Sequence, residues 1–316
     1  MQEHHARRLH WDFRLERDGV LVSWAVPKGL PADPKTNHLA VHTEDHPLDY
    51  IDFEGEIPRG SYGAGDVVVW DHGTYEVHKW EPKEVMVTLH GGRVRGKYVL
   101  FRTRGDDWMV HRMDPPQDPG REPMPDTVLP MRARTGRLPK DESAYGFEIL
   151  WQGVRAIALV EGGRARVHDE HGADVSDRFP ELRALGPAIG SRELVVDGVI
   201  VAPDDEGHPS AERLERRFAA SKRAAKDVPV VHMVFDLLYL DGHQTGALPY
   251  AQRRERLDEL GLAGPAWQTP ASHPGDGTTL LEAARAQGLP GVVAKRLDST
   301  YEPGKTSRAW VEVRAS

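Results

Sequence analysis

Hydrophobic and polar residues alternate along the first third of the chain, in short runs that end at turn residues. Seven such runs predict strands, and they are LHWDFRLE (9–16), VLVSWAV (20–26), HLAVHTE (38–44), DVVVW (66–70), TYEVHKW (74–80), VMVTLHG (85–91) and KYVLFRT (97–103). Segments rich in glycine, proline and aspartate separate them, as expected for strands joined by turns. The pattern predicts an antiparallel barrel or sandwich for residues 1–112.

The pattern changes after residue 112. Seven prolines fall between Met113 and Pro139, and this density predicts a linker over residues 113–125. Beyond it, three apolar runs predict strands and two further runs have helical spacing. The strands are FEILW (147–151), ELVVDGVIVA (193–202) and HMVFDLLYL (232–240), and the helices are SAERLERRFAASKRAA (210–225) and LPYAQRRERLDELG (248–261). Strands that alternate with helices predict an α+β fold for residues 126–316.

The length of 316 residues is about twice that of a usual single domain, so we expect two domains with separate cores. The net charge of −8 gives no overall attraction to nucleic acid, so DNA or RNA binding requires a local basic groove. The first residues lack an apolar segment, and no run of about 18 apolar residues occurs. We therefore expect a cytoplasmic protein with no membrane partner.

The sequence contains no cysteine. Disulfides, thiolate zinc sites and a cysteine nucleophile are therefore excluded, and a metal site has to be built from histidine, aspartate or glutamate. Ten of the sixteen histidines lie in residues 1–112.

The run LHWDFRLE alternates strictly, with its polar residues at even positions. On a strand, His10, Asp12 and Arg14 project from one face at steps of roughly 6.6 Å, and His4 has the same parity. A half-buried strand with a solvated polar face explains this alternation equally well. Two histidines and an aspartate are also a ligand set for a divalent transition metal, and an arginine beside them can bind a phosphate through two hydrogen bonds.

A second run, VHTEDHPLDY (41–50), carries His42, Glu44 and His46 at alternate positions. Taken singly, each histidine is explained more simply as a surface or hydrogen-bonded residue than as a catalytic one. Taken together, the two runs can enclose one site.

Five segments in order resemble a known family: HHARRLHWDFRLE, SWAVPKG, AVHTEDHPLDY, FEGEIPRGSYGAGDVVVWD and GGRVRGKYVLFRT. Through about residues 2–112 the chain resembles the 3′-phosphoesterase domain of bacterial DNA ligase D. The resemblance implies a small β-barrel that uses Mn²⁺ to heal 3′ ends of nucleic acid, removing a terminal ribonucleoside and then the 3′-phosphate. It further implies that His4, His10 and Asp12 bind the metal. It also implies that Arg14, His46 and Tyr50 bind the phosphate.

Those residue types suit the chemistry, because a metal and a guanidinium together stabilise charge on the non-bridging oxygens of a phosphate ester. A protonated His46 can donate to the phosphate or the leaving oxygen, and Tyr50 can add a hydrogen bond. Glu44 is a candidate for orienting a metal-binding histidine. His38 occupies a position where the family tends to have arginine, so we expect the phosphate to be bound more weakly or in a pH-dependent way. The family usually has a segment before the position of His4. We therefore expect either that this sequence starts inside a longer gene product or that part of the active site is missing.

Residues 126–316 resemble the adenylating, nucleotidyltransferase domain of ATP-dependent DNA ligases. The segments that carry the resemblance are FEILWQGVRAI, DRFPEL, ELVVDGVIVA, VFDLLYLDG, LPYAQRRERLDEL, GVVAKR and SRAWVEVR. Their order and spacing imply the nucleotidyltransferase fold.

Six positions depart from the catalytic pattern of that family. Leu150 stands at the lysine nucleophile of the K-x-D-G motif and offers no amine to attack an α-phosphate. The other departures are Gln152 for the aspartate of that motif, Glu170 for an arginine, Val199 for a metal-binding glutamate, Pro290 for an acidic residue and Glu312 for a lysine. We therefore expect a pseudo-ligase domain that does not use ATP as a covalent cofactor.

The leading hypothesis is a Mn²⁺-dependent phosphoesterase that processes DNA or RNA-containing 3′ ends in repair or non-homologous end joining, tethered to a noncatalytic domain. Its expected partners are primer-template or broken duplex ends and end-joining proteins such as a polymerase, a ligase or an end-binding protein, in the nucleoid of a bacterial cytoplasm. The alternative is a noncatalytic DNA-repair binding module. An active ATP-dependent DNA ligase is the third hypothesis, and Leu150 argues against it.

Overall fold

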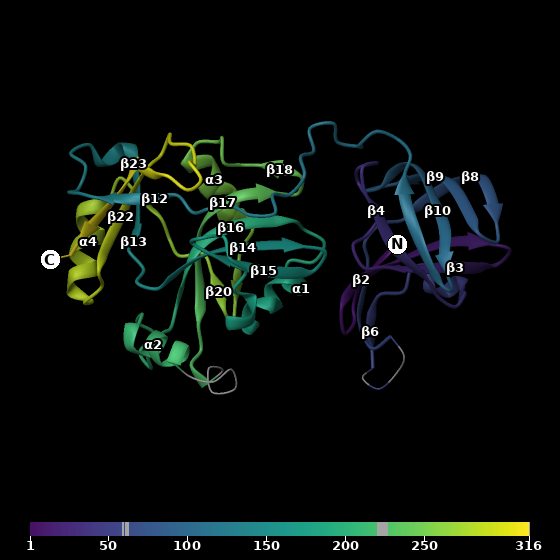
Figure 1. Cartoon of the computed structure of the whole chain (residues 1–316), viewed down its shortest axis with the longest axis horizontal. Coiled ribbons are helices and arrows are strands. Elements are labelled where there is room, and N and C mark those ends of the chain that lie inside the picture. Colours follow the sequence, from purple (N-terminus) through teal and green to yellow (C-terminus); the bar gives the residue numbers. More distant parts are fainter. Residues whose placement is uncertain (59, 61–62, 220–226, 316) are drawn as a thin grey trace. The chain divides into compact units, whose positions relative to one another are not determined.

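A computed structural model describes residues 1–58, 60, 63–219 and 227–315 of the chain. The chain divides into two compact units, the first consisting mainly of Met1–Arg121 and the second mainly of the chain that follows Arg121 (Figure 1). No helix in these described ranges is long and apolar enough to cross a membrane.

The first unit is built from antiparallel strands that form one sheet. The strands are β1 (Gln2–His5), β2 (Leu9–Arg17), β3 (Val20–Val26), β4 (Asn37–His42), β5 (His46–Pro47), β6 (Gly55–Ile57), β7 (Gly65–Val69), β8 (Gly73–Glu81), β9 (Glu84–Gly91), β10 (Arg95–Arg104) and β11 (Asp107–Arg112), with a 3₁₀ turn at Leu48–Tyr50. Their order is β6-β7-β1-β2-β3-β4-β11-β10-β9-β8, and β5 pairs with β3. All seven strands predicted from alternation are confirmed.

The sheet is not closed into a barrel by its strand pairs. Its two ends are β6 and β8, and no pair between these two strands is found in the part of the chain that the structure describes. β6 is only three residues long, so one edge of the sheet offers few backbone groups for pairing. The antiparallel strands were predicted from the sequence, whereas closure depends on pairing between residues far apart in it.

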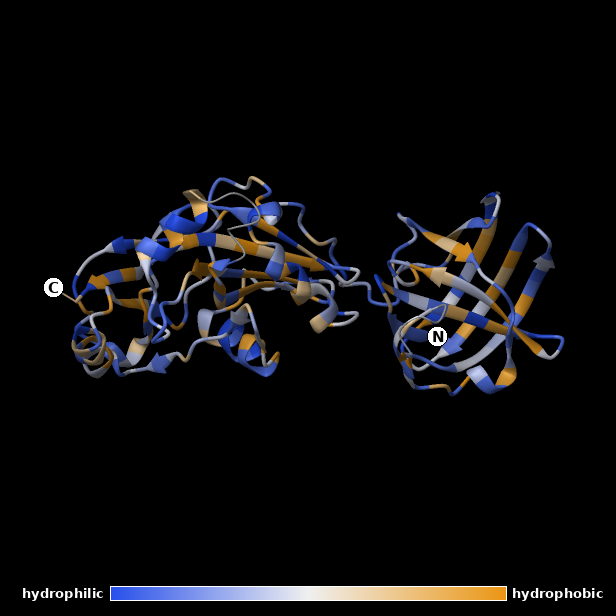
Figure 2. Ribbon diagram, turned by 90° about the horizontal axis from the view of Figure 1, so that it is seen from below, coloured by the Kyte–Doolittle hydropathy of each residue, from blue (hydrophilic) through white to orange (hydrophobic). Residues whose placement is uncertain are grey.

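Strict alternation places the core on one face of β2 and β3. Leu9, Trp11, Phe13 and Leu15 are each at most 6% exposed, and the last two pack with Trp24 in the core of the unit. The strands of this unit change colour between hydrophobic and hydrophilic along their length (Figure 2), as expected when one face is buried. The polar residues of β2 therefore project from the opposite face.

A tight turn sets the register between β2 and β3. Asp18 and Gly19 have positive φ angles of 52° and 85°, and an Asp-Gly pair adopts this conformation readily. The turn places Arg14 opposite Ser23 and Asp12 opposite Ala25. The register thus brings a hydroxyl beside the arginine that the sequence singled out.

The second unit contains two mostly antiparallel sheets. The strand order of the smaller sheet is β12 (Arg132–Thr135), β23 (Thr306–Arg314), β22 (Gly291–Arg296), β13 (Tyr145–Ile149) and β21 (His273–Pro274). The strand order of the larger sheet is β15 (Arg164–Asp169), β14 (Val154–Glu161), β16 (Leu194–Val201), β17 (Val231–Leu240), β20 (Trp267–Gln268) and β19 (Ala263–Gly264). In the larger sheet, β18 (His243–Gln244) also pairs with β17. The helices include α1 (Leu185–Ala188), α2 (Ala211–Ala219), α3 (Tyr250–Glu259) and α4 (Gly277–Ala286). The predicted strands and the α+β composition are confirmed, and both predicted helices are present; residues 220–225 of the first lie outside the described residues.

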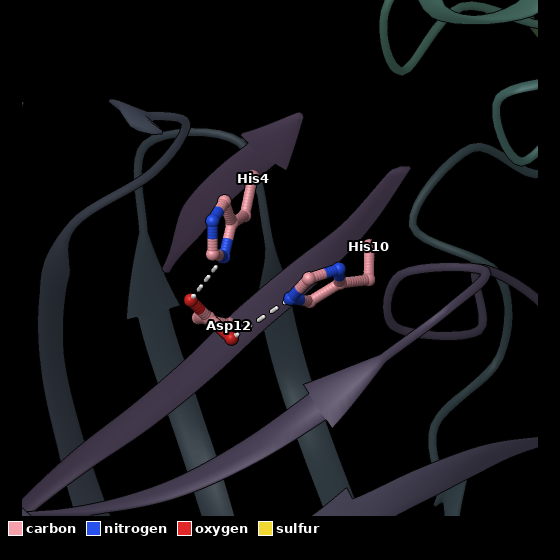
Figure 3. A group of neighbouring side chains, drawn as sticks. All are labelled: His4, His10 and Asp12. Carbon is pink, nitrogen blue, oxygen red and sulfur yellow. Dashed lines mark ion pairs between the residues drawn. The ribbon is translucent and has the colours of Figure 1, made fainter. Parts of the chain in front are cut away.

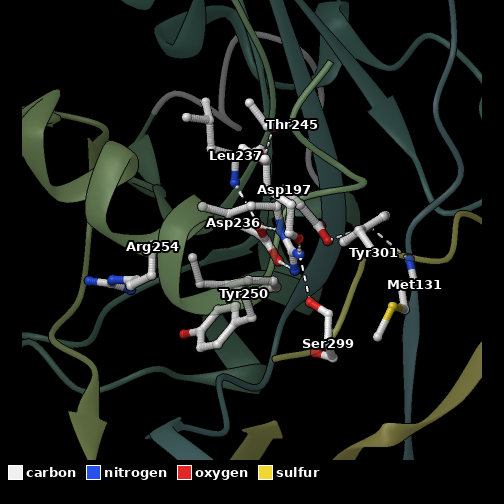
Figure 4. A network of polar contacts seen from close by, with 12 residues as sticks. Met131, Asp197, Asp236, Leu237, Thr245, Tyr250, Arg254, Ser299 and Tyr301 are labelled. Atoms are coloured by element: carbon white, nitrogen blue, oxygen red, sulfur yellow. Dashed lines mark hydrogen bonds and ion pairs between the residues drawn. The ribbon is translucent and has the colours of Figure 1, made fainter. Parts of the chain in front are cut away.

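Two buried carboxylates face each other on neighbouring strands of the larger sheet, Asp197 on β16 and Asp236 on β17. Each has its own arginine: Arg155 binds Asp197 through two hydrogen bonds of 2.6 and 2.7 Å, and Arg253 binds Asp236 at 2.7 and 2.9 Å. Tyr301 adds a hydrogen bond to Asp197 (Figure 4). An unpaired buried carboxylate strongly destabilises a fold. The centre of the sheet is therefore stable only when both the carboxylate and the arginine of each pair are present.

Candidate functional site

The pairing of β1 with β2 brings the predicted metal ligands together. His4 lies directly opposite His10, and Gln2 lies opposite Asp12, so all four side chains share the polar face of the sheet. The rings of His4 and His10 have centroids 4.6 Å apart. In Figure 3 both imidazoles point toward the carboxylate of Asp12.

The hydrogen bonds of the two histidines fix which nitrogen faces Asp12. His4 Nε2–H donates to the carbonyl of Gly63 at 2.7 Å, and His10 Nδ1–H donates to the carbonyl of Arg8 at 3.0 Å. The other nitrogens, His4 Nδ1 and His10 Nε2, lie 3.3 and 3.4 Å from the two oxygens of Asp12. In neutral rings these nitrogens carry lone pairs that face a carboxylate, so a proton or a cation has to lie between them.

The three residues fit a divalent metal ion. Their ligand atoms all lie within 4.8 Å of one another, and N and O ligands lie about 2.1 Å from such an ion, so small movements let them share one. His4 Nδ1 is buried and makes no hydrogen bond within the described ranges, and backbone carbonyls orient both rings as in known metal sites. The donor set of two nitrogens and one oxygen suits a transition metal such as Mn²⁺ or Zn²⁺.

The same residues set the protonation of Asp12 and His10. Burial disfavours the Asp12 carboxylate, but His10, His4 and the positive charge of Arg14 outweigh it and hold the pKa of Asp12 well below its ordinary range. Burial likewise opposes protonation of His10, yet Asp12 outweighs that effect and raises the pKa of the His10 imidazole. Asp12 is thus available as a carboxylate ligand at neutral pH.

Arg14 is held rigidly beside the metal ligands. Its Nη2 donates to Asp12 Oδ2 at 3.0 Å, its Nε to Gln2 Oε1 at 2.9 Å and its Nη1 to Ser23 Oγ at 2.7 Å. Burial lowers the pKa of Arg14, and the nearby Asp12 partly offsets this. Since these bonds use three of the five N–H groups of a guanidinium, two donors remain for a bound anion.

His46 and Tyr50, in the segment after β4, lie close to Arg14 and Ser23. The His46 and Tyr50 rings meet edge to face with centroids 5.2 Å apart, and the Arg14 guanidinium lies 5.9 Å from the centre of the Tyr50 ring. Gln2 Nε2 donates to the backbone carbonyls of Tyr50 and Phe53, both at 2.9 Å. One buried amide therefore fixes Arg14 and the Tyr50 segment together.

The remaining predicted site residues contribute differently. The carbonyl of Glu44 accepts a hydrogen bond from His46 Nδ1 at 2.8 Å, while the Glu44 side chain is exposed. His38 donates from Nδ1 to the carbonyl of Gly29 at 2.8 Å, and within the described residues it has no hydrogen bond or ion pair to Arg14 or to the metal ligands. Burial lowers the pKa of His38, which favours its neutral form.

Sequence reasoning missed Gln2 and Ser23. Ser23 is the single polar residue of the run VLVSWAV and shares the parity of the site face, which is the signal that was available. Gln2 precedes the first histidine by two positions, and parity alone would place it on the same face.

Replacing Ser23 by alanine is expected to lower activity at this site by about 10- to 100-fold, the range for losing a residue that orients a ligand. The substitution removes the hydroxyl that holds Arg14 Nη1 and lies 3.4 Å from His46 Nδ1. Ser143→Ala, which removes an exposed hydroxyl in the second unit, is the control. Steady-state hydrolysis of a phosphate ester measures the effect, and wild-type rates for Ser23→Ala would show that Arg14 needs no such support.

The six departures in the second unit lie in different surroundings. Val199 is 8% exposed and packs with Met131, Phe235 and Trp310, so an apolar side chain completes the core there. Glu312 forms an ion pair with Arg314. The backbone N–H of Leu150 donates to the Gly291 carbonyl, and the Pro290 carbonyl accepts a hydrogen bond from the Ala315 N–H. Gln152 is exposed, and the Glu170 carboxylate lies 3.9 Å from His171 Nε2.

A buried lysine of the smaller sheet forms an internal ion pair. Lys295 on β22 is 2% exposed along its side chain, and its Nζ lies 2.6 Å from Glu148 Oε2. The ammonium also lies 3.9 Å from the centre of the Phe235 ring and 4.5 Å from that of Trp310. Burial lowers the pKa of Lys295, and Glu148 opposes that effect.

Comparison with known proteins gives a consistent identification of both units. Residues 2–102 match the DNA Ligase D 3′-phosphoesterase domain, and residues 137–314 match the ATP dependent DNA ligase domain. The multifunctional non-homologous end joining protein LigD of Mycobacterium bovis is 44% identical over 317 residues, covering 99% of this chain and 41% of that protein. LigD of Pseudomonas aeruginosa is 32% identical over 369 residues, covering 99% of this chain and 43% of that protein.

Solved structures agree for the second unit. A mycobacterial DNA ligase D complexed with ATP and MES superimposes with a TM-score of 0.55 at 34% identity, covering 60% of each chain. The chain spans about two fifths of the length of the curated relatives it matches. On these matches the chain belongs to the LigD family and contains a LigD 3′-phosphoesterase domain followed by an ATP-dependent DNA ligase domain.

Proposed function

We propose that the first unit is a Mn²⁺-dependent phosphoesterase that heals 3′ ends of nucleic acid. The observation that carries the proposal is the convergence of His4 Nδ1, His10 Nε2 and the Asp12 carboxylate next to a guanidinium with free donors. A phosphate ester needs both a cation and directed hydrogen bonds to stabilise its developing negative charge. The family match to a 3′-phosphoesterase domain supports the same reaction class.

Each residue has a separate task in this proposal. His4, His10 and Asp12 hold the metal, which when bound polarises a phosphate oxygen or activates a water molecule. Arg14 binds non-bridging oxygens of the phosphate through its two remaining donors. His46 donates a proton to the leaving oxygen from Nε2, since its Nδ1 is engaged by the Glu44 carbonyl. Tyr50, whose ring lies 5.9 Å from the Arg14 guanidinium, adds a hydrogen bond to the phosphate.

The wider assignment follows from the same resemblance. We propose residues 1–112 as the phosphoesterase domain, 113–125 as a linker and 126–316 as a pseudo-ligase domain without covalent adenylation. The substrates are 3′-ribonucleoside and 3′-phosphate ends in DNA repair by non-homologous end joining in bacteria. The relatives named above are multifunctional end-joining proteins, which supports end-joining partners for this chain.

Activity on defined ends tests this function. A primer-template with one 3′-terminal ribonucleotide, incubated with the full chain and Mn²⁺, is expected to lose the ribonucleoside and then the 3′-phosphate, and EDTA is expected to stop both steps. Binding of the same substrate without any product formation would favour the noncatalytic binding module instead.

Replacing Arg14 by lysine is expected to lower the phosphoesterase rate by more than about tenfold, although the charge is kept. An ammonium cannot reproduce the planar guanidinium that bonds Asp12, Gln2 and Ser23 while two donors stay free. Arg17→Lys is the matched control, because Arg17 lies on the same strand with 43% of its side chain exposed. Wild-type rates for Arg14→Lys would contradict the role of Arg14 as a two-point phosphate ligand.

A further inference from the structure

A group of apolar side chains lies on the side of the first unit's sheet that faces away from its core. On β10 and β11, Leu100 and Val110 point into the core, so residues of the opposite parity project from the other side of the sheet. These residues, which we call the apolar face, are Leu39 on β4, Met86 on β9, Val99 and Phe101 on β10, Met109 on β11 and Met113 directly after β11.

The strand register makes these side chains neighbours. Met109 lies opposite Leu39 on β4 and opposite Phe101 on β10, and Val99 lies opposite Met86 on β9. Side chains at such cross-strand positions are close enough to pack together. Four adjacent strands therefore contribute to one continuous apolar surface.

This surface is unusual for a sheet with one buried side, whose other side normally carries polar residues. Leu39 is 41% exposed and Met113 is 44% exposed, and the described residues within 1–121 form no α-helix that could cover them. Three of the seven methionines of the chain lie on the apolar face, and methionine is common in binding surfaces because its side chain adapts to a partner. Grouped exposed apolar side chains of this kind mark protein interaction sites.

Two charged residues lie at opposite ends of the apolar face. Lys97 comes two residues before Val99 on β10, and Asp107 comes two residues before Met109 on β11. Because β10 and β11 are antiparallel, the starts of these two strands lie at opposite ends of the face. Neither charged side chain forms an ion pair within the part of the chain that the structure describes.

Other polar residues on this side of the sheet are paired within the chain. His111 Nδ1–H donates to Asn37 Oδ1 at 2.7 Å, and Glu84 Oε1 lies 3.1 Å from Lys79 Nζ. The charges at the two ends of the apolar face therefore remain available to a partner.

We propose that the apolar face binds the same face of a second copy of this chain. Sheets that stack face to face keep their strands roughly aligned, about 10 Å apart. A twofold axis that lies between the two sheets and crosses the strands reverses the second copy end for end. The Lys97 end of each face then meets the Asp107 end of the other, and the apolar centres meet between them. The proposal goes beyond the phosphoesterase function and does not depend on it.

The mass of the full chain in solution tests the proposal. Sedimentation equilibrium is expected to show a monomer–dimer equilibrium with a Kd in the micromolar range, as for a small interface. Phe101→Glu is expected to weaken the dimer by more than about 100-fold, because it buries a carboxylate without a partner at the centre of the interface.

Reversal of the two charges is the sharper test, because both residues lie outside the core. Lys97→Asp and Asp107→Lys are each expected to weaken the dimer about tenfold, since each sets like charges against each other at two symmetry-related contacts. The double variant only exchanges the two charges, so its Kd is expected to return to within about threefold of the wild-type value. The matched control is Lys83→Asp, which changes an exposed residue in the turn between β8 and β9 and is expected to change the Kd less than about twofold.

Three outcomes would overturn the inference. One is a chain that remains monomeric at about 100 µM, where an interface of micromolar affinity is largely formed. Another is a dimer that either Phe101→Glu or both single reversals leave unchanged, which excludes the proposed packing. The third is a double reversal that dimerises no better than the single ones. Thermal unfolding checks that each variant is folded, and the charge reversals keep the proposal testable if Phe101→Glu is not.

Discussion

Replacing both His10 and Asp12 by alanine is expected to abolish stoichiometric Mn²⁺ binding and to reduce the 3′-phosphoesterase rate by far more than 100-fold. Losing one residue that merely orients a ligand costs about 10- to 100-fold in metal affinity or activity, and this change removes two of the three ligands themselves. The remaining nitrogen of His4 cannot hold the ion alone. Metal titration by calorimetry and the primer-template assay measure the two effects.

The fold is expected to survive this double change. His10 and Asp12 lie on the polar face of β2, while the core residues Phe13 and Leu15 face the other way. His10→Ala alone leaves Asp12 to balance Arg14 and is the milder test. Asp12→Asn keeps the shape of the side chain and removes only its charge, which separates charge from packing.

A neighbouring histidine supplies the matched control. His5 lies on the same strand as His4 with the opposite parity, and its Nε2 lies 2.8 Å from Glu3 Oε1. His5→Ala is therefore expected to leave metal binding and hydrolysis within about twofold of the wild type. One Mn²⁺ bound per chain, with wild-type affinity, in the His10 and Asp12 double variant would show that the metal site lies elsewhere.

The alternation of side chains along a strand predicts only part of the candidate site. Alternation in LHWDFRLE places His10, Asp12 and Arg14 on one face, and the structure puts Leu9, Trp11, Phe13 and Leu15 on the other. The position of His4 opposite His10 depends on the register of β1 with β2, which short polar sequences specify weakly. The resemblance to a known family, not periodicity, assigned His4, His46 and Tyr50.

What the sequence could not predict depends on contacts between distant segments. The bonds from Gln2 to the Tyr50 and Phe53 carbonyls join residues about fifty positions apart. The side chain of Ser23 faces Arg14 because a two-residue turn sets the hairpin register. Closure of a barrel also depends on long-range pairing, and the strand pairs of the described residues leave β6 and β8 as ends.

In the second unit, periodicity predicted strands but not the burial of charge inside them. HMVFDLLYL was predicted as a strand from its apolar residues, and Asp236 within it is fully buried. The sequence gives no sign that Arg253, on α3, supplies its partner. A single charged residue in an apolar run therefore indicates a buried ion pair whose other half has to be found in the structure.

Incubation of the chain with ATP and a divalent metal is expected to form no covalent adenylate. The reaction needs an uncharged lysine aligned with the α-phosphate, and a metal and cations that stabilise the leaving pyrophosphate. Leu150 carries no amine, Val199 contributes an apolar side chain to the core, and Glu312 presents a negative charge paired with Arg314. We expect ligation of nicked DNA to be absent for the same reasons.

Lys295 is a buried lysine of the second unit, and its environment argues against a role as a replacement nucleophile. Its ammonium is buried, paired with Glu148 at 2.6 Å and surrounded by the rings of Phe235 and Trp310. Attack on ATP would require breaking this buried ion pair, which is costly, even though Glu148 would keep its contacts with Arg254 and Tyr250. The lowered pKa of Lys295 alone does not make its amine accessible.

Restoring the amine alone is expected to fail as well. Leu150→Lys places a lysine at the position of the family nucleophile, but Val199 still supplies no carboxylate for a metal and Glu312 still repels the triphosphate. Leu150→Arg is the matched control, because it adds the same charge without a nucleophilic amine. Incubation with α-labelled ATP, denaturing electrophoresis and an acid wash measures the product, with an active ATP-dependent DNA ligase run in parallel. An acid-labile labelled band in the wild-type chain would show that another lysine carries out adenylation, and a band in Leu150→Lys alone would show that the nucleophile is the only element the site lacks.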